Sequence, residues 1–179
     1  MAKLAIRIVP DPILKNVADP VERVDEEVRR LMDDMLETMY AAPGIGLAAP
    51  QVGISRRVIV LDCAGEEEAA QPLRMANPEV LWTAGEREVR EEGCLSLPDL
   101  YADVSRPRAV RLRYLDEAGE AQELEAEGLL ATVVQHEIDH LNGVLFTDHL
   151  SALKRNMMLR KHLKQRQRKP AKSQQSATA

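Results

Sequence analysis

The spacing of apolar side chains predicts a helix near the start of the chain and strands in its middle. Over residues 26–41 the apolar positions recur with the 3.6-residue period of a helix that buries one face, and Asp25 can cap its first turn. Residues 56–62 form an apolar, β-branched run typical of a strand, and residues 108–116 alternate between apolar and charged side chains. A turn then leads into residues 121–127, which can return antiparallel to the preceding strand.

Two further helices are predicted towards the end of the chain. Residues 127–143 carry an apolar run followed by the sequence HEIDH, and Ser151 can cap a last helix that ends at about residue 165. Residues 166–179 contain no core-forming side chains and are expected to be a basic, disordered tail, which leaves residues 1–165 as a single domain. A helix first, strands in the middle and helices last indicate an α+β fold.

Composition limits the classes of protein to which the chain can belong. Its 179 residues, 45% of them apolar, suffice for one domain with its own core, and no apolar run reaches the roughly 18 residues of a membrane span. The N-terminal stretch does not have the pattern of a signal peptide, and two cysteines are too few for a disulfide scaffold, so we expect a cytoplasmic protein without membrane association.

Residues 1–149 hold 15 basic and all 29 acidic residues, a net −14, whereas the residues after 149 carry nine positive charges. This asymmetry indicates a basic appendage for an anionic partner.

The sequence HEIDH, residues 136–140, has the spacing of a metal site. Two residues four apart lie on one face of a helix, so His136 and His140 can hold one ion, and Glu137 can act as general acid or base on a water beside it. The alternative is a chance pattern of histidines with ordinary hydrogen-bond partners. The metal interpretation is favoured because the preceding apolar run is expected to bury the helix, where two unpaired histidines would be costly.

A catalytic metal site of this kind needs a third protein ligand and an open position for water. Phe146 occupies the position at which an extended form of the motif has its third histidine, and no acidic residue follows Asp148. The third ligand is therefore expected upstream. Cys63 ends an apolar strand and is expected to be a packing residue, whereas Cys94 follows a glycine in the polar stretch EEGCLS, which favours ligation. One thiolate and two imidazoles suit zinc, iron(II), cobalt or nickel.

Three stretches together resemble one known family. GIGLAAPQ at 44–51, EGCLS at 92–96 and QHEIDH at 135–140, in this order, are similar to the motifs of the peptide deformylases, and the resemblance covers roughly residues 5–165. Taken alone, the first stretch is a glycine-containing turn that can also offer donors to an oxyanion. Deformylases remove the N-formyl group from the initiator methionine of new bacterial polypeptides and release formate. The resemblance implies this reaction, and antiparallel or mixed sheets wrapped around a central metal-binding helix that carries HEIDH.

The resemblance also implies a role for each matching residue. The implied metal ligands are Cys94, His136 and His140, with Glu137 as general acid or base and an oxyanion hole made of Gln51 and the backbone N–H of Leu95. The implied contacts of the substrate main chain are Ile45, Gly46 and Gly93, and the implied lining of the methionine pocket is Ile45, Glu92, Leu129 and Val133. One divalent ion is implied, iron(II) in the cell, with zinc, nickel or cobalt as replacements.

Some features lie outside the three motifs. Some bacterial relatives have an arginine where this chain has Tyr101, so substrate contacts beyond the methionine stay open. Arg106, further along, is either solvated or paired with an acidic neighbour such as Glu92. The last helix and tail are similar to the extension with which bacterial deformylases dock on ribosomal RNA, and their positive charges fit phosphate contacts, although a solubilising tail is the alternative.

The resemblance implies formyl-methionyl nascent peptides as substrates, the ribosome as a partner and a monomeric enzyme. Two other functions stay open from the residues alone. One is a metal-dependent amidase or peptidase that acts on other blocked peptides. The other is a non-catalytic, metal-stabilised domain that binds RNA through its basic end.

Overall fold

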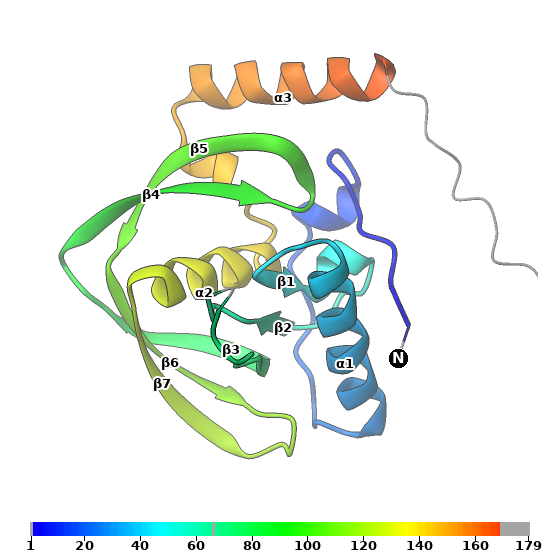
Figure 1. Ribbon diagram of the computed structural model, residues 1–179, viewed down its shortest axis with the longest axis vertical. Helices are drawn as coiled ribbons and strands as arrows, with labels where there is room; N and C mark the ends of the chain where they lie inside the picture. Colours follow the sequence, from blue (N-terminus) through cyan, green and yellow to red (C-terminus); the bar gives the residue numbers. More distant parts are fainter. Residues whose placement is uncertain (1, 66, 169–179) are drawn as a thin grey trace, which may run out of the picture.

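Two antiparallel sheets and three α-helices form the fold in the computed structural model, which describes residues 2–65 and 67–168 (Figure 1). The helices are α1 (Glu26–Ala41), α2 (Gly128–Leu141) and α3 (Ala152–Arg168). The strands are β1 (Gly46–Ala48), β2 (Val58–Leu61), β3 (Leu73–Thr83), β4 (Arg87–Cys94), β5 (Leu97–Pro107), β6 (Ala109–Leu115) and β7 (Ala121–Glu127). One sheet has the strand order β1-β2-β3-β6-β7, and β4 pairs with β5 in the other.

Helix α2, which carries HEIDH, lies between the two sheets. In Figure 1 the β4–β5 pair passes above α2, and most of the five-stranded sheet lies below it. Helix α3 lies on the far side of the β4–β5 pair, and α1 runs down one side of the five-stranded sheet. The implied α+β fold, with antiparallel sheets around a central metal-binding helix, is confirmed.

Strand β2 joins the two main layers of the core. All four of its side chains are fully buried. Because successive side chains of a strand point to opposite faces, Val58 and Val60 pack with the apolar face of α1, whereas Ile59 and Leu61 pack with α2. A strand that is buried on both faces has a continuous run of apolar residues, and this is why a strand could be predicted over residues 56–62.

The predicted helix ends agree closely with the structure. Asp25 accepts the backbone N–H of Val28 at 3.0 Å at the start of α1, and Ser151 Oγ accepts that of Lys154 at 3.3 Å at the start of α3. The last helix runs to Arg168, past the predicted end at 165, since its lysine, arginine and glutamine side chains favour helix and Arg166 donates to the carbonyl of Val9 at 2.6 Å. The rest of the predicted tail, 169–179, lies outside the described residues.

The strands from β3 to β5 were not predicted from the sequence. On β4 the usual pattern is inverted, because Glu92 is buried whereas the Val89 side chain is 62% exposed. The inner face of this strand meets charged and metal-binding groups, not an apolar core. An alternation read from hydrophobicity alone therefore misses the strand.

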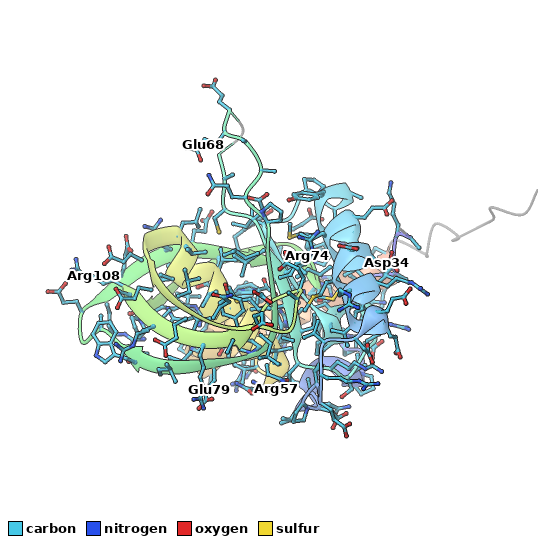
Figure 2. The ribbon with its side chains drawn as sticks, turned by 90° about the horizontal axis from the view of Figure 1, so that it is seen from below. Asp34, Arg57, Glu68, Arg74, Glu79 and Arg108 are labelled. Atoms are coloured by element: carbon cyan, nitrogen blue, oxygen red, sulfur yellow. The ribbon has the colours of Figure 1, made fainter. Side chains whose placement is uncertain are left out.

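Charged side chains cover the outer surface. Glu68 stands on the connection between β2 and β3, which projects away from both sheets (Figure 2). Arg74 lies beside α1, where its guanidinium pairs with Asp33 at 3.0 Å. Among the helices in the described part of the chain, none is both long and apolar enough to cross a membrane.

Candidate metal centre

The two histidines of HEIDH lie one turn apart on α2 and point to the same place. Their Nε2 atoms are 3.2 Å apart, and Cys94 Sγ, at the end of β4, lies 3.3 Å from His140 Nε2. All three donor atoms fall within 4.8 Å of one another. Cys94, 42 residues upstream of the first histidine, is therefore the third member of the site.

These separations fit one shared ion. Tetrahedral coordination with Zn–N and Zn–S bonds of ordinary length places two nitrogens about 3.3 Å apart and a nitrogen and a sulfur about 3.5 Å apart. Neither the imidazole pair nor the cysteine–histidine pair departs from this by more than a few tenths of an ångström. The donor set of one thiolate and two imidazoles is also one that binds divalent transition metals.

A hydrogen bond with Glu92 sets the tautomer of His136. Its Nδ1 lies 3.0 Å from Glu92 Oε2, so Nδ1 donates and Nε2 keeps a lone pair directed at the metal position. Burial raises the pKa of Glu92, but hydrogen bonds from His136 and Arg106 outweigh this and hold the pKa at about 2. Phe146 stacks on the His136 ring with centroids 6.2 Å apart, which further restricts the ring.

Arg106 is paired, which decides between the two alternatives that the sequence left open. Its guanidinium donates to both carboxylate oxygens of Glu92, at 2.6 and 3.0 Å, and to Asp139 at 2.8 Å. Asp139 also accepts a hydrogen bond from His149 at 2.7 Å. A surface histidine, two carboxylates and one arginine therefore form a connected network behind the metal-binding side chains.

Glu137 has a buried carboxyl group in the wall of the site, beside Gly46. The residue is only 4% exposed, and its Oε2 has no hydrogen-bond partner among the described residues. Gly46 of β1 packs against it so closely that a Cβ at this position would collide with Oε1. Burial raises the pKa of Glu137 to about 7, where the carboxyl group can both accept and release a proton near neutral pH.

Gln51 approaches the centre from the short 3-10 helix Ala49–Val52. Its Oε1 accepts the backbone N–H of Ala48 at 2.9 Å, which fixes the amide so that Nε2 faces the site. Nε2 lies 3.5 Å from Cys94 Sγ and donates to Ser96 Oγ at 3.2 Å. Sequence reasoning did not assign a role to Ser96, although this residue belongs to the same EGCLS stretch.

A single cavity of about 500 Å³ brings the candidate residues together. Its wall combines apolar side chains with metal-binding and acidic groups. Eleven of the twelve candidate site residues line it: Ile45, Gly46, Gln51, Glu92, Gly93, Cys94, Leu95, Leu129, Val133, His136 and Glu137. His140 is the exception, since it is almost fully buried and its ring packs edge-to-face against that of His136. Tyr101 also lines the cavity, and its ring lies so close to Gly93 that a Cβ there would approach it to 2.6 Å.

The remaining cysteine and histidines lie elsewhere. Cys63 is half-buried and packs against the core around α2, where burial raises the pKa of its thiol to about 11. His162 donates from α3 to the carbonyl of Val9 at 2.8 Å, and His149 contacts Asp139. These contacts agree with the expectation that Cys94 is the metal-binding cysteine and Cys63 a packing residue.

A cysteine and two histidines whose donor atoms converge beside a cavity and a buried glutamate define a metal-dependent hydrolase of the HExxH type. The polypeptide deformylase family model matches residues 3–156. The peptide deformylase of Rhizobium meliloti is 57% identical over 166 residues, which cover 93% of this chain and 95% of that protein. The peptide deformylase of Mesorhizobium japonicum is 60% identical over 157 residues, covering 88% and 89% of the two chains.

Solved structures agree with the sequence matches. The crystal structure of peptide deformylase from Ehrlichia chaffeensis superposes with a TM-score of 0.89 at 38% identity and covers 93% of this chain and 98% of that chain. The chain belongs to the peptide deformylase family. Its activity is the removal of N-formyl groups from nascent peptides.

Proposed function

We propose that the enzyme hydrolyses the formyl amide of N-terminal formyl-methionine in new polypeptides and releases formate, with the residues of this cavity in defined roles. The observation that carries the proposal is the position of Glu137. Its Oε2 is buried and has no hydrogen-bond partner among residues 2–65 and 67–168, and the carboxyl group lies beside the metal-binding residues in the wall of the cavity. A carboxyl group so placed is free to exchange a proton, and burial raises its pKa to about 7, which suits proton transfer near neutral pH.

The metal-binding residues are Cys94, His136 and His140. A divalent ion held there would polarise a carbonyl group and make a water nucleophilic near neutral pH. Iron(II) is our proposal for the ion in the cell, and zinc, nickel and cobalt are alternatives that the same donors accept. Metal analysis of protein purified without oxygen, alongside turnover of the same sample, tests this choice.

Gln51 and Leu95 orient the formyl group. The amide Nε2 of Gln51 and the backbone N–H of Leu95 donate to the formyl oxygen, where negative charge develops during attack on the carbon. The internal hydrogen bond from Ala48 to Gln51 Oε1 holds the amide in the donating orientation before substrate arrives. This preorganisation avoids a reorganisation cost at the moment of reaction.

Glu137 moves the proton. Its carboxylate takes a proton from the attacking water and delivers it to the amine nitrogen as the carbon–nitrogen bond breaks, so that formate and a free N-terminus leave. Substitution Glu137→Ala is expected to abolish turnover of formyl-Met-Ala-Ser. Intact turnover in this variant would show that another group carries the proton.

The methionine side chain is proposed to enter the apolar part of the cavity. Ile45, Leu129 and Val133 line this region. The substrate main chain then lies between two free strand edges, because β1 is the edge of the larger sheet and β4 pairs only with β5. Ile45 and Gly46 on one side and Gly93 on the other can hydrogen-bond an extended peptide, as in strand addition.

A blocked peptide of another kind is the competing substrate. Comparing formyl-Met-Ala-Ser with acetyl-Met-Ala-Ser separates the two, since the acetyl group carries one more methyl group that must be accommodated beside the metal-binding residues and Glu137. We expect strong preference for the formyl peptide. Equal rates would identify a general amidase and refute the narrower proposal.

We further propose that the enzyme acts in the cytoplasm as a monomer and binds the ribosome through α3. This helix contains seven lysine or arginine residues and no acidic residue, while buried His162 and the contact of Arg166 with Val9 hold it on the body. Replacing the exposed Arg160, Lys161 and Lys164 with glutamate should abolish salt-dependent co-sedimentation with ribosomes without loss of peptide turnover. Light scattering tests the oligomeric state.

A further inference from the structure

Arg106 makes an unusual set of contacts for a residue outside the cavity wall. It is 4% exposed, and each of its three guanidinium nitrogens makes a hydrogen bond to a carboxylate. Two bonds form a fork with Glu92 on β4, and the third reaches Asp139 on α2. The arginine itself belongs to β5.

The two carboxylates lie close in sequence to the metal-binding residues, Glu92 on β4 and Asp139 on α2. Glu92 precedes Cys94 by two residues and contacts His136 directly, at 3.0 Å. Asp139 immediately precedes His140. We propose that Arg106 is a positioning residue that sets the affinity and geometry of the metal centre by tying β4, which carries the cysteine, to α2, which carries both histidines.

Backbone pairing does not supply this tie. Strands β4 and β5 pair only with each other, and their register shifts at the Gly93–Cys94 step, where the cysteine leaves the regular ladder. The relative position of Cys94 and α2 therefore depends on side chains. Glu92 of β4 bonds His136 of α2 directly, and Gln135 adds one bond from α2 to the carbonyl of Pro107 on β5 at 3.0 Å; Arg106 joins Glu92 to Asp139 and so links all three elements.

Charge and shape explain why an arginine stands here. The Glu92 side chain is only 4% exposed, and a carboxylate left there without a cation would be strongly unfavourable, whereas Asp139 adds a second negative charge at 22% exposure. The planar guanidinium can bind one carboxylate with two nitrogens and a second with the third. A lysine ammonium carries the same charge but cannot reproduce the fork and the third bond in fixed directions.

The test uses the full-length protein, freed of metal and titrated with Co²⁺ in competition with a chelator, with the visible absorption of bound cobalt as a measure of coordination geometry. Arg106→Lys is expected to weaken Co²⁺ affinity about 10- to 100-fold, the usual effect of removing a group that orients metal ligands, and to shift the cobalt bands. Asp139→Asn, which keeps the fork with Glu92, should act in the same direction with a smaller effect. Thermal unfolding of the metal-free proteins separates these changes from a general loss of stability.

Arg108→Lys is the matched control. Arg108 pairs with Glu86 at 2.7 Å and lies at the outer edge of the molecule, away from the metal centre (Figure 2). This variant should keep the wild-type Co²⁺ affinity and spectrum. If Arg106→Lys and Asp139→Asn also keep both, the proposed role is refuted, and if Arg106→Lys does not fold, Asp139→Asn decides alone.

The inference rests on the proposed ligands, so Cys94→Ser is measured in the same series. Loss of Co²⁺ binding in Cys94→Ser with unchanged binding in Arg106→Lys and Asp139→Asn would overturn only the role of Arg106. Unchanged binding in Cys94→Ser would instead overturn the ligand assignment, and with it this inference.

Discussion

Substituting Gly46 with alanine tests whether the position of Glu137 controls catalysis. The added Cβ would collide with Glu137 Oε1 and lie 2.9 Å from its Cδ and 3.0 Å from its Cγ. Carbon atoms in contact need roughly half an ångström more than this, so the carboxyl group must shift by about 0.5–1 Å. A misplacement of about 1 Å at a reacting group can cost on the order of 100-fold in rate.

We therefore expect Gly46→Ala to lower kcat for formyl-Met-Ala-Ser by roughly 100-fold. Metal content should stay at the wild-type level, because none of the three ligands is touched. The matched control is Gly85→Ala, since a Cβ at Gly85 meets nothing within 4 Å. It should leave kcat unchanged.

A double-mutant cycle separates displacement of Glu137 from simple obstruction of the substrate. In a Glu137→Asp background the shorter side chain makes room for the Cβ, so Gly46→Ala should have much less further effect on the already reduced rate. If instead the two substitutions act additively, or if Gly46→Ala raises KM with kcat unchanged, the displacement argument is wrong and Gly46 acts only on substrate binding.

Three further predictions follow from other contacts. Cys94→Ser should lose most of the bound metal measured by elemental analysis, whereas Cys63→Ser should keep it; the opposite result would exchange their roles. Partial burial and the 2.6 Å hydrogen bond to Asp62 raise the pKa of Tyr40 to about 12, and burial also raises the pKa of Tyr114. A tyrosine ultraviolet titration should therefore show a phenol that ionises near pH 12 and returns towards about 10 in Asp62→Asn, while the other phenols are unchanged. Because the folded-state pKa is raised, this contact stabilises the fold below about pH 10 and its contribution is lost as the pH rises towards about 12, which pH-dependent unfolding measures. Phe146→Ala should cost about 3–5 kcal/mol in a denaturant titration, because the ring is 1% exposed and stacks on His136; a loss below about 1 kcal/mol would mean that the ring is not a core element.

The sequence by itself predicted those features that depend on residues close together in the chain. The four-residue interval between His136 and His140 places both on one helix face whatever surrounds them, and Asp25 marks a helix start through bonds within one turn. Strand β2 was evident because both of its faces are buried. The family motifs then implied partners for these residues, including Cys94 and Gln51.

Only the tertiary structure decided which distant groups share the site and how they are connected. On β4 the charged Glu92 is buried and the apolar Val89 is exposed, the opposite of the usual pattern. The reason is that the inner face of this strand contacts Arg106 and His136 and not an apolar core. From the sequence alone Arg106 could equally have been solvated, since its state depends on two carboxylates that lie 14 residues before it and 33 residues after it. Periodicity reports the faces of single elements, whereas contacts of this kind arise only when β4, β5 and α2 pack together.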